Sequence, residues 1–208
     1  MKNRKLYAAA LAATLAVSAF GTTVMAAEGT TNFKYQPGTA GPTEPVNPGD
    51  EESSANNWMV TYPRQITLMD SNEMKDDTVA TAATIGQKLE FTVKQRVAGA
   101  DGSSAVTSDN VGTGISVAAG EGTTGSWTTA SDIVMKGTTK DTNTVIMQIA
   151  DAETTKFVNK ADTLMTLTHE TDKDSDQAFA VIKKDQVKTA VEGETYTVDV
   201  KFTFTRGA

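Results

Sequence analysis

Alternation of apolar and polar residues most constrains how this chain can fold. Apolar residues occupy most of the alternate positions in residues 88–97 and again in residues 196–204. Successive side chains of a β-strand point to opposite faces, whereas a helix repeats every 3.6 residues. Each of these segments therefore predicts a strand with one buried face and one solvated face.

Weaker strand patterns and turn residues complete the fold prediction. The weaker patterns lie at residues 58–62, 65–69, 114–118, 133–135, 144–149, 163–168 and 179–182. Helical patterns are short and confined to residues 151–159 and 183–190. The 34 threonines of the 208 residues also suit pleated, half-exposed surfaces. About nine strands without alternating long helices predict an all-β fold, namely an antiparallel β-sandwich of the Ig-like or Greek-key type with about 8–10 strands.

Residues 1–27 are predicted to be a secretory signal peptide rather than part of the fold. Three basic residues precede an apolar stretch of about 15 residues, which is shorter than the roughly 20 needed to span a bilayer. Small residues around Ala26 suit cleavage after Ala26 or Ala27. We therefore expect a secreted protein with no membrane span in the mature chain.

Residues 28–57 are predicted to be an extended N-terminal segment and linker, ahead of a surface domain at residues 58–208. Four of the five prolines lie within residues 37–48, with glycines among them, and this composition is typical of a semi-rigid tether. Before the prolines, Phe33 and Tyr35 lie on one face of a short alternating segment. That segment is a candidate intersubunit strand, because an extended peptide can add to an open sheet edge.

Charge and composition exclude several function classes. Removing the signal peptide takes away three basic residues and no acids, so the 19 basic and 26 acidic residues of the full chain become a mature net charge of −10. Such a chain repels nucleic-acid phosphates and anionic lipid. The absence of cysteine removes disulfides and thiol chemistry, and any histidine-dependent catalysis would have to use His169. We expect no enzyme activity and no cofactor.

Two further features are weaker candidates for sites. Asp172, Asp174 and Asp176 resemble the opening of a calcium loop, but the glycine and glutamate that complete an EF-hand loop are absent. A solvated acidic loop is the favoured interpretation over a weak cation site. Of the two tryptophans, Trp58 is expected in the core, whereas Trp127 lies in a loop rich in glycine and threonine and is a candidate for ligand contact.

The front of the chain resembles WxL-domain proteins of Gram-positive bacteria. The resemblance rests on the signal peptide, on residues 33–39 (FKYQPGT) and on residues 41–48 (GPTEPVNP). It extends over most of the mature chain, because the family follows such a segment with a β-rich domain that ends the chain. The resemblance implies non-covalent attachment to peptidoglycan at the cell surface.

Two Trp-x-Leu motifs define that family, and both differ here. Phe202 and Phe204 stand where the Trp and Leu of the last strand would be, and the segment with Leu89 and Phe91 is the candidate for the first motif. Aromatic and aliphatic exchanges keep an inward face apolar, so the fold is expected to tolerate them. These four residues, with Trp127, are the candidate wall-contact residues.

The function predicted from the sequence is that of a non-enzymatic surface protein of a Gram-positive bacterium. It would bind peptidoglycan or another surface protein, such as an adhesion complex. One alternative is a self-assembling subunit of a surface filament or layer that uses residues 31–35 as an added strand. A second alternative is an exported carbohydrate-active hydrolase, which would need acidic residues converging in a cleft.

Overall fold

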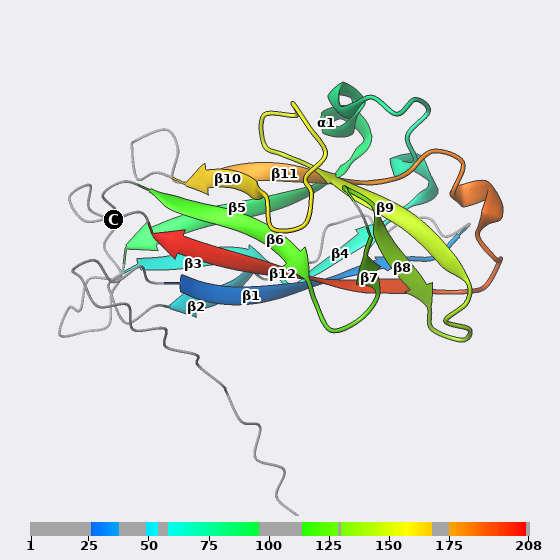
Figure 1. Ribbon diagram of the computed structural model, residues 1–208, viewed down its shortest axis with the longest axis horizontal. Helices are drawn as coiled ribbons and strands as arrows, with labels where there is room; N and C mark the ends of the chain where they lie inside the picture. The colour runs from blue at the N-terminus through cyan, green and yellow to red at the C-terminus, as the bar shows by residue number, and fades with distance from the viewer. Residues whose placement is uncertain are drawn as a thin grey trace, which may run out of the picture.

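The computed structural model describes residues 26–37, 49–53, 58–95, 114–128, 130–167 and 175–206, and these residues are mostly strand (Figure 1). The predicted all-β fold is confirmed. The strands are β1 (Ala26–Tyr35), β2 (Gly49–Ser53), β3 (Trp58–Pro63), β4 (Gln65–Leu68), β5 (Gln87–Gln95), β6 (Ile115–Glu121), β7 (Ser126–Trp127), β8 (Ile133–Gly137), β9 (Thr144–Ala150), β10 (Thr163–Leu167), β11 (Ser175–Ile182) and β12 (Tyr196–Arg206).

All twelve strands in the described part of the chain belong to one mixed sheet that nearly closes into a barrel. Its main path runs β10-β6-β12-β8-β9-β11-β5-β3-β2, with β1 beside β12 and β4, and with β7 beside β8. Within the described strands, the β1–β4 pair is parallel and the other pairs are antiparallel. An antiparallel Ig-like sandwich is therefore not confirmed.

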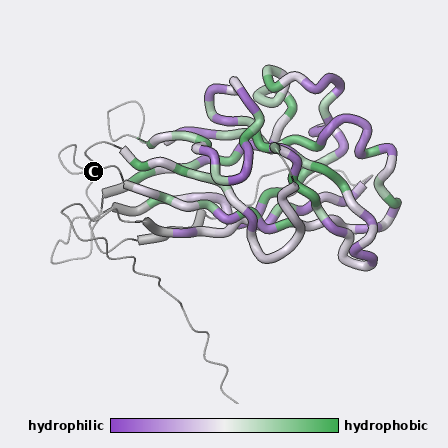
Figure 2. Tube along the Cα trace, viewed as in Figure 1, coloured by the Kyte–Doolittle hydropathy of each residue, from purple (hydrophilic) through white to green (hydrophobic). Residues whose placement is uncertain are grey.

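The alternation in the sequence becomes the inside and outside of this barrel. In β5, Leu89, Phe91 and Val93 are buried. In β12 the buried positions run from Tyr196 to Phe204 at every second residue. Figure 2 shows that hydrophobic residues recur along the strands and that hydrophilic residues gather in the loops. A shift of one residue in the pairing of either strand with its neighbours would turn its apolar side chains toward solvent. Burial of these side chains therefore sets the strand register.

The segment before residue 58 contributes two strands to the sheet, where the sequence suggested one short strand and a tether. Strand β1 spans ten residues and pairs along its whole length with β12, from Ala26 opposite Thr205 to Tyr35 opposite Tyr196. Among the described strands, β2 pairs with β3 alone, and it starts directly after Pro48 in the sequence. An edge strand tolerates a preceding proline and acidic residues, because one side of its backbone has no partner strand.

Helical structure is limited to single turns in the described chain. They are α1 (Ala82–Ile85) and the 3-10 turns η1 (Asp70–Asn72), η2 (Val79–Thr81) and η3 (Val187–Thr189). The helix predicted at 183–190 is reduced to η3, and the helix predicted at 151–159 is wrong, because this segment forms turns. Nowhere in the described ranges is a helix long and apolar enough to cross a membrane.

Candidate functional site

The two segments that resemble Trp-x-Leu motifs meet inside the barrel. Leu89, Phe91, Phe202 and Phe204 are all fully buried. The ring of Phe91 stands edge-on to Phe202, with centroids 5.0 Å apart, and lies 6.3 Å from the ring of Phe204. Edge-to-face packing of this kind is favourable for aromatic pairs. The four residues are therefore core residues, and they have no exposed surface with which to contact a wall polymer.

Trp127 is also an inward residue. Its side chain is only 6% exposed, and its Nε1–H donates a hydrogen bond to the carbonyl oxygen of Ala130 at 3.0 Å. Ala130 has a positive φ of 64°, so the turn after β7 brings this carbonyl back toward the indole. Because Trp127 belongs to the core cluster and so little of it is exposed, its indole is not available to stack on a sugar ring. The side chain of Trp58 lies outside the described set.

The structure describes only part of the acidic segment that was considered as a weak cation site. Asp176 is half-buried at the start of β11, and its Oδ1 accepts a hydrogen bond from the backbone N–H of Gln177. Asp172, Asp174 and His169 lie outside the described residues. Among the residues that are described, no group of three or more potential ligands could hold a metal ion.

Phe33 and Tyr35 lie in the core of this chain's own sheet. Both are fully buried, and the ring of Tyr35 stacks on Tyr196 with centroids 6.0 Å apart. The hydroxyl of Tyr35 donates a hydrogen bond to Asp70 Oδ1 at 2.7 Å. Burial of the phenol, followed by this hydrogen bond and the nearby carboxylates, raises the pKa of Tyr35 far above its usual range. The phenol therefore stays a neutral donor.

The rest of β1 fits a slot formed by β12, β4 and the end of β3. The hydroxyl of Thr31, itself fully buried, donates to the carbonyl oxygen of Pro63. The backbone N–H of Asn32 donates to the carbonyl oxygen of Arg64 at 2.9 Å. Gly29 lies under the ring of Tyr62, where any Cβ would overlap the phenol. Both the backbone and the inward side chains of β1 are thus matched to this slot.

A polar contact joins β1 to β12 on the outer face. Asn32 Nδ2 donates to Asp199 Oδ1 at 2.9 Å, and Thr123 Oγ1 donates to Asp199 Oδ2 at 2.7 Å. Partial burial opposes ionisation of Asp199, but the hydrogen bonds from Asn32, Thr123 and Thr124 outweigh it and lower the pKa of Asp199 below its ordinary value. Asp199 therefore stabilises the fold in its ionised form.

We expect acid to remove the stabilising effect of Asp199. Because its pKa is lower in the folded state than in the unfolded chain, the contribution is complete above about pH 4 and disappears as the pH falls through the folded-state pKa. Solvent screening limits it to about 1 kcal/mol. Urea unfolding at neutral pH and at about pH 2.5 should show a smaller acid-induced loss for Asp199→Asn than for the unmodified chain.

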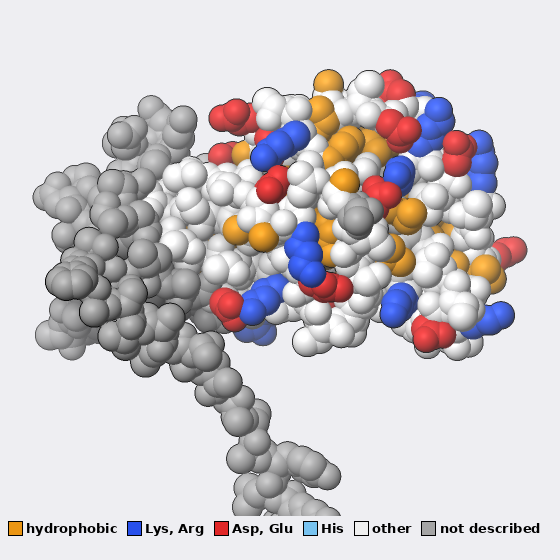
Figure 3. Space-filling view, in the orientation of Figure 1, with side chains coloured by type: hydrophobic (Ala, Val, Ile, Leu, Met, Phe, Trp, Pro, Cys, Tyr) orange, Lys and Arg blue, Asp and Glu red, His pale blue; other side chains and the backbone are white. Residues whose placement is uncertain are grey.

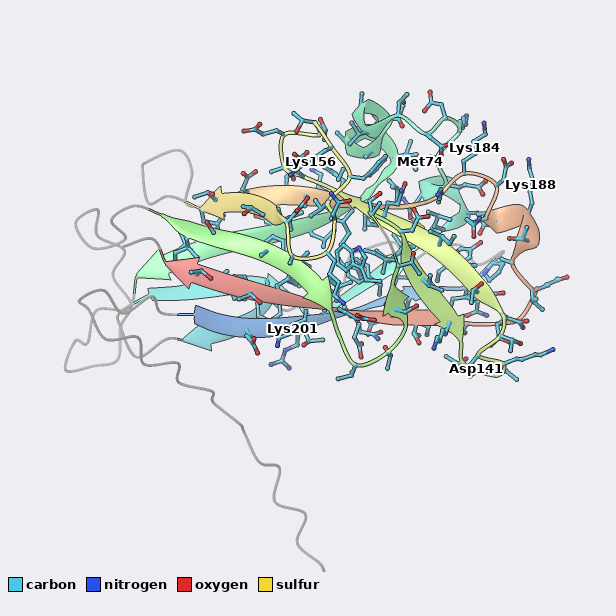
Figure 4. The ribbon with its side chains drawn as sticks, in the orientation of Figure 1. Met74, Asp141, Lys156, Lys184, Lys188 and Lys201 are labelled. Carbon is cyan, nitrogen blue, oxygen red and sulfur yellow. The ribbon has the colours of Figure 1, made fainter. Side chains whose placement is uncertain are left out.

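The matched control for this prediction is Asp141→Asn, which removes an exposed carboxylate from the turn between β8 and β9 (Figure 4). This control should retain the full acid-induced loss of stability. Equal acid sensitivity of Asp199→Asn and the unmodified chain would contradict the role given to Asp199.

The outer surface of β1, β12, β6 and β10 carries a set of short hydroxyl side chains, which we call the hydroxyl face. Its members are Thr30, Ser116, Thr163, Thr166, Thr203 and Thr205. Each is exposed or half-buried at an outward position of its strand. Within the described chain, none of these six hydroxyls takes part in a side-chain hydrogen bond. In Figure 3 much of the surface over β6 is white, and acidic and basic side chains lie beside it over β1 and β12. Glu28 of β1 forms an ion pair with Lys201 of β12.

Strand register aligns part of the hydroxyl face in a row. Thr166 of β10 is opposite Ser116 of β6, which is in turn opposite Thr205 of β12. With strands about 4.8 Å apart, the three hydroxyl-bearing positions extend over about 10 Å. The alternation in the sequence predicted a solvated face for β12, but it did not predict which strands lie beside that face. The signal for the face itself was present, because Thr197, Thr203 and Thr205 alternate with the buried residues.

Comparison with known proteins adds no relative. No protein-family model, curated protein or solved structure matches this chain.

Proposed function

We propose that this chain is a non-enzymatic protein, secreted to the cell surface of a Gram-positive bacterium, where it associates non-covalently with peptidoglycan. The observation that carries the proposal is the hydroxyl face, a regular set of outward hydroxyl side chains on neighbouring strands in which Thr166, Ser116 and Thr205 form a row. The predicted signal peptide supports secretion.

The chemistry of the hydroxyl face suits a glycan. Threonine and serine hydroxyls both donate and accept hydrogen bonds, as do sugar hydroxyls and N-acetyl groups. A row of hydroxyls about 10 Å long, such as Thr166, Ser116 and Thr205, matches the scale of two adjacent sugar rings. Phosphate-bearing wall polymers are the weaker candidate, because the net charge of −10 of the mature chain would repel them.

The WxL-domain resemblance remains part of this proposal. The contact between Phe91 and Phe202 supports it, because the two segments singled out by the resemblance are far apart in the chain and pack together in the core. Since these aromatic residues are buried, we propose that the outer face contacts the wall in their place. The aromatic substitutions then preserve the inner packing and leave the binding surface unchanged.

We further propose that the barrel is a closed form of a two-layered sandwich. One layer would contain β10, β6, β12, β1 and β4, and the other β9, β11, β5, β3 and β2, with β8 linking them at β12. The packing of Phe91 in β5 against Phe202 and Phe204 in β12 supports two facing layers. The Ig-like topology within these layers is likewise a proposal.

Cosedimentation with purified sacculi tests the wall proposal. The chain from residue 27 onward, which lacks the predicted signal peptide, should sediment with sacculi stripped of secondary polymers. The triple variant Thr166→Ala, Ser116→Ala and Thr205→Ala should bind at least tenfold more weakly, because each neutral hydrogen bond contributes about 0.5–1.5 kcal/mol. The matched control Thr138→Ala and Thr144→Ala removes exposed hydroxyls elsewhere and should bind normally.

Three results would overturn this proposal. The chain could fail to sediment, or the triple variant could bind as well as the unmodified chain. Release of soluble reducing sugar from the sacculi would instead favour the hydrolase alternative. Circular dichroism of each variant establishes that the fold is intact, and outward threonines of a strand are expected to affect it little.

A further inference from the structure

Strand β1 is held in the sheet by non-covalent contacts with residues much later in the chain. Ten register pairs join it to β12 and four join it to β4 (Figure 1). An ion pair between Glu28 Oε1 and Lys201 Nζ, 2.7 Å long, adds to these contacts on the outer face. The strands that form the slot are all contributed by residues 58–206, so the slot belongs to the body of the domain.

The slot recognises the sequence of β1 as well as its backbone. Its inward positions are Gly29, Thr31, Phe33 and Tyr35, all buried. The ring of Tyr62 requires glycine at position 29, and Pro63 and Asp70 accept hydrogen bonds from the hydroxyls of Thr31 and Tyr35. When a strand adds to the sheet of another molecule, main-chain hydrogen bonds supply the affinity. Pockets for its alternate side chains supply the specificity.

The connection between β1 and the body does not confine β1 to its own molecule. Tyr35 and Gly49 are separated by thirteen residues, four of which are proline. A proline-rich stretch of this length reaches about 40 Å when extended, whereas a domain of about 150 residues has a radius of gyration of about 15 Å.

We propose that β1 of one molecule occupies the slot between β12 and β4 of a second copy of this chain. The contacts are the same within and between molecules, so the exchange replaces one set of native bonds by an identical set. Because the donor end and the acceptor slot are different surfaces, successive exchanges join molecules head to tail. This interaction is independent of the wall contact and gives the self-assembly alternative a defined interface.

Paired cysteine variants test the exchange directly. The chain contains no cysteine, and Thr30 lies directly opposite Lys201 on the outer face. Two residues opposite each other in antiparallel strands lie within disulfide range. The variants Thr30→Cys and Lys201→Cys are purified separately, unfolded together in urea, refolded at high concentration and oxidised. Exchange predicts a covalent heterodimer in which mass spectrometry finds the bond between positions 30 and 201.

The matched control mixes Thr30→Cys with Lys136→Cys. Lys136 is exposed on β8 and is not a register partner of β1. The Thr30→Cys and Lys201→Cys mixture should give at least about tenfold more heterodimer than this control, since pairing in the sheet raises the effective thiol concentration. A single chain that carries both Thr30→Cys and Lys201→Cys should close within itself and verifies the geometry.

Native mass spectrometry of the unmodified chain, refolded at high concentration, is the second measurement. Exchange predicts dimers and longer oligomers that persist on dilution, because dissociation requires β1 to leave a slot in which two large aromatic side chains are buried. Exclusively monomeric chains, together with heterodimer no more abundant than in the Lys136→Cys control, would overturn the proposal.

Discussion

Alanine in place of Phe91 is expected to lower the free energy of unfolding by about 3–5 kcal/mol, the usual cost of removing a buried aromatic ring. Phe91 is fully buried, and its ring contacts those of both Phe202 and Phe204. The cavity would lie between β5 and β12, which are far apart in the sequence. Urea unfolding followed by tryptophan fluorescence measures the loss as a lower midpoint at an unchanged slope.

The matched control is Phe157→Ala, which removes a phenylalanine ring that is only partly buried at the edge of a smaller cluster. This control should cost clearly less stability. In a double-mutant cycle, Phe91→Ala and Phe202→Ala should be less than additive by about 0.5–1.5 kcal/mol, the range found for aromatic pairs. If Phe91→Ala lowered the free energy of unfolding by less than about 1 kcal/mol, the placement of Phe91 in the core would be contradicted.

Deletion of residues 26–36 is expected to abolish cooperative unfolding. It removes Phe33 and Tyr35, each comparable to a buried ring worth about 3–5 kcal/mol, and leaves one edge of β12 without its partner strand. The combined loss reaches the total stability of a typical domain, about 5–15 kcal/mol. The truncated chain should therefore lose its near-ultraviolet circular dichroism and its sharp urea transition.

Addition of a synthetic peptide of residues 26–37 should restore both signals, because the slot lies in the remaining chain. A peptide with the single change Gly29→Val is the control and should fail, since its side chain would overlap the ring of Tyr62. A truncated chain that unfolds cooperatively within about 1 kcal/mol of the full chain would show that β1 is dispensable.

Residues 151–159 show where local pattern and tertiary structure diverge. The spacing of apolar residues there suggested a short helix. In the structure, the carboxylate of Asp151 accepts hydrogen bonds from the backbone N–H groups of Thr155 and Lys156, and Thr154 has a positive φ of 53°. An aspartate that binds nearby backbone donors stabilises a turn in competition with a helix. The hydrogen bonds to the carboxylate of Asp151 therefore favour turns over a helix in residues 151–159.

The candidate site was predictable only in part. Phe202 and Phe204 were correctly placed on one side of a strand, but their contact with Phe91 joins segments more than 100 residues apart and depends on sheet closure. The hydroxyl face has the same origin. Thr166, Ser116 and Thr205 come from three strands, and only their registers bring them into one row.

The period of the side-chain pattern determined that β5 and β12 are strands and which of their faces is buried, because alternation is a local property of an extended backbone. The sequence also indicated that Phe33 and Tyr35 share a face of a strand. Only the tertiary structure decided that β1 lies between β12 and β4, that the sheet is mixed and nearly closed, and that the aromatic motif positions lie inside it. These features depend on which strands become neighbours, and that choice is made by the summed burial and hydrogen bonding of the whole chain.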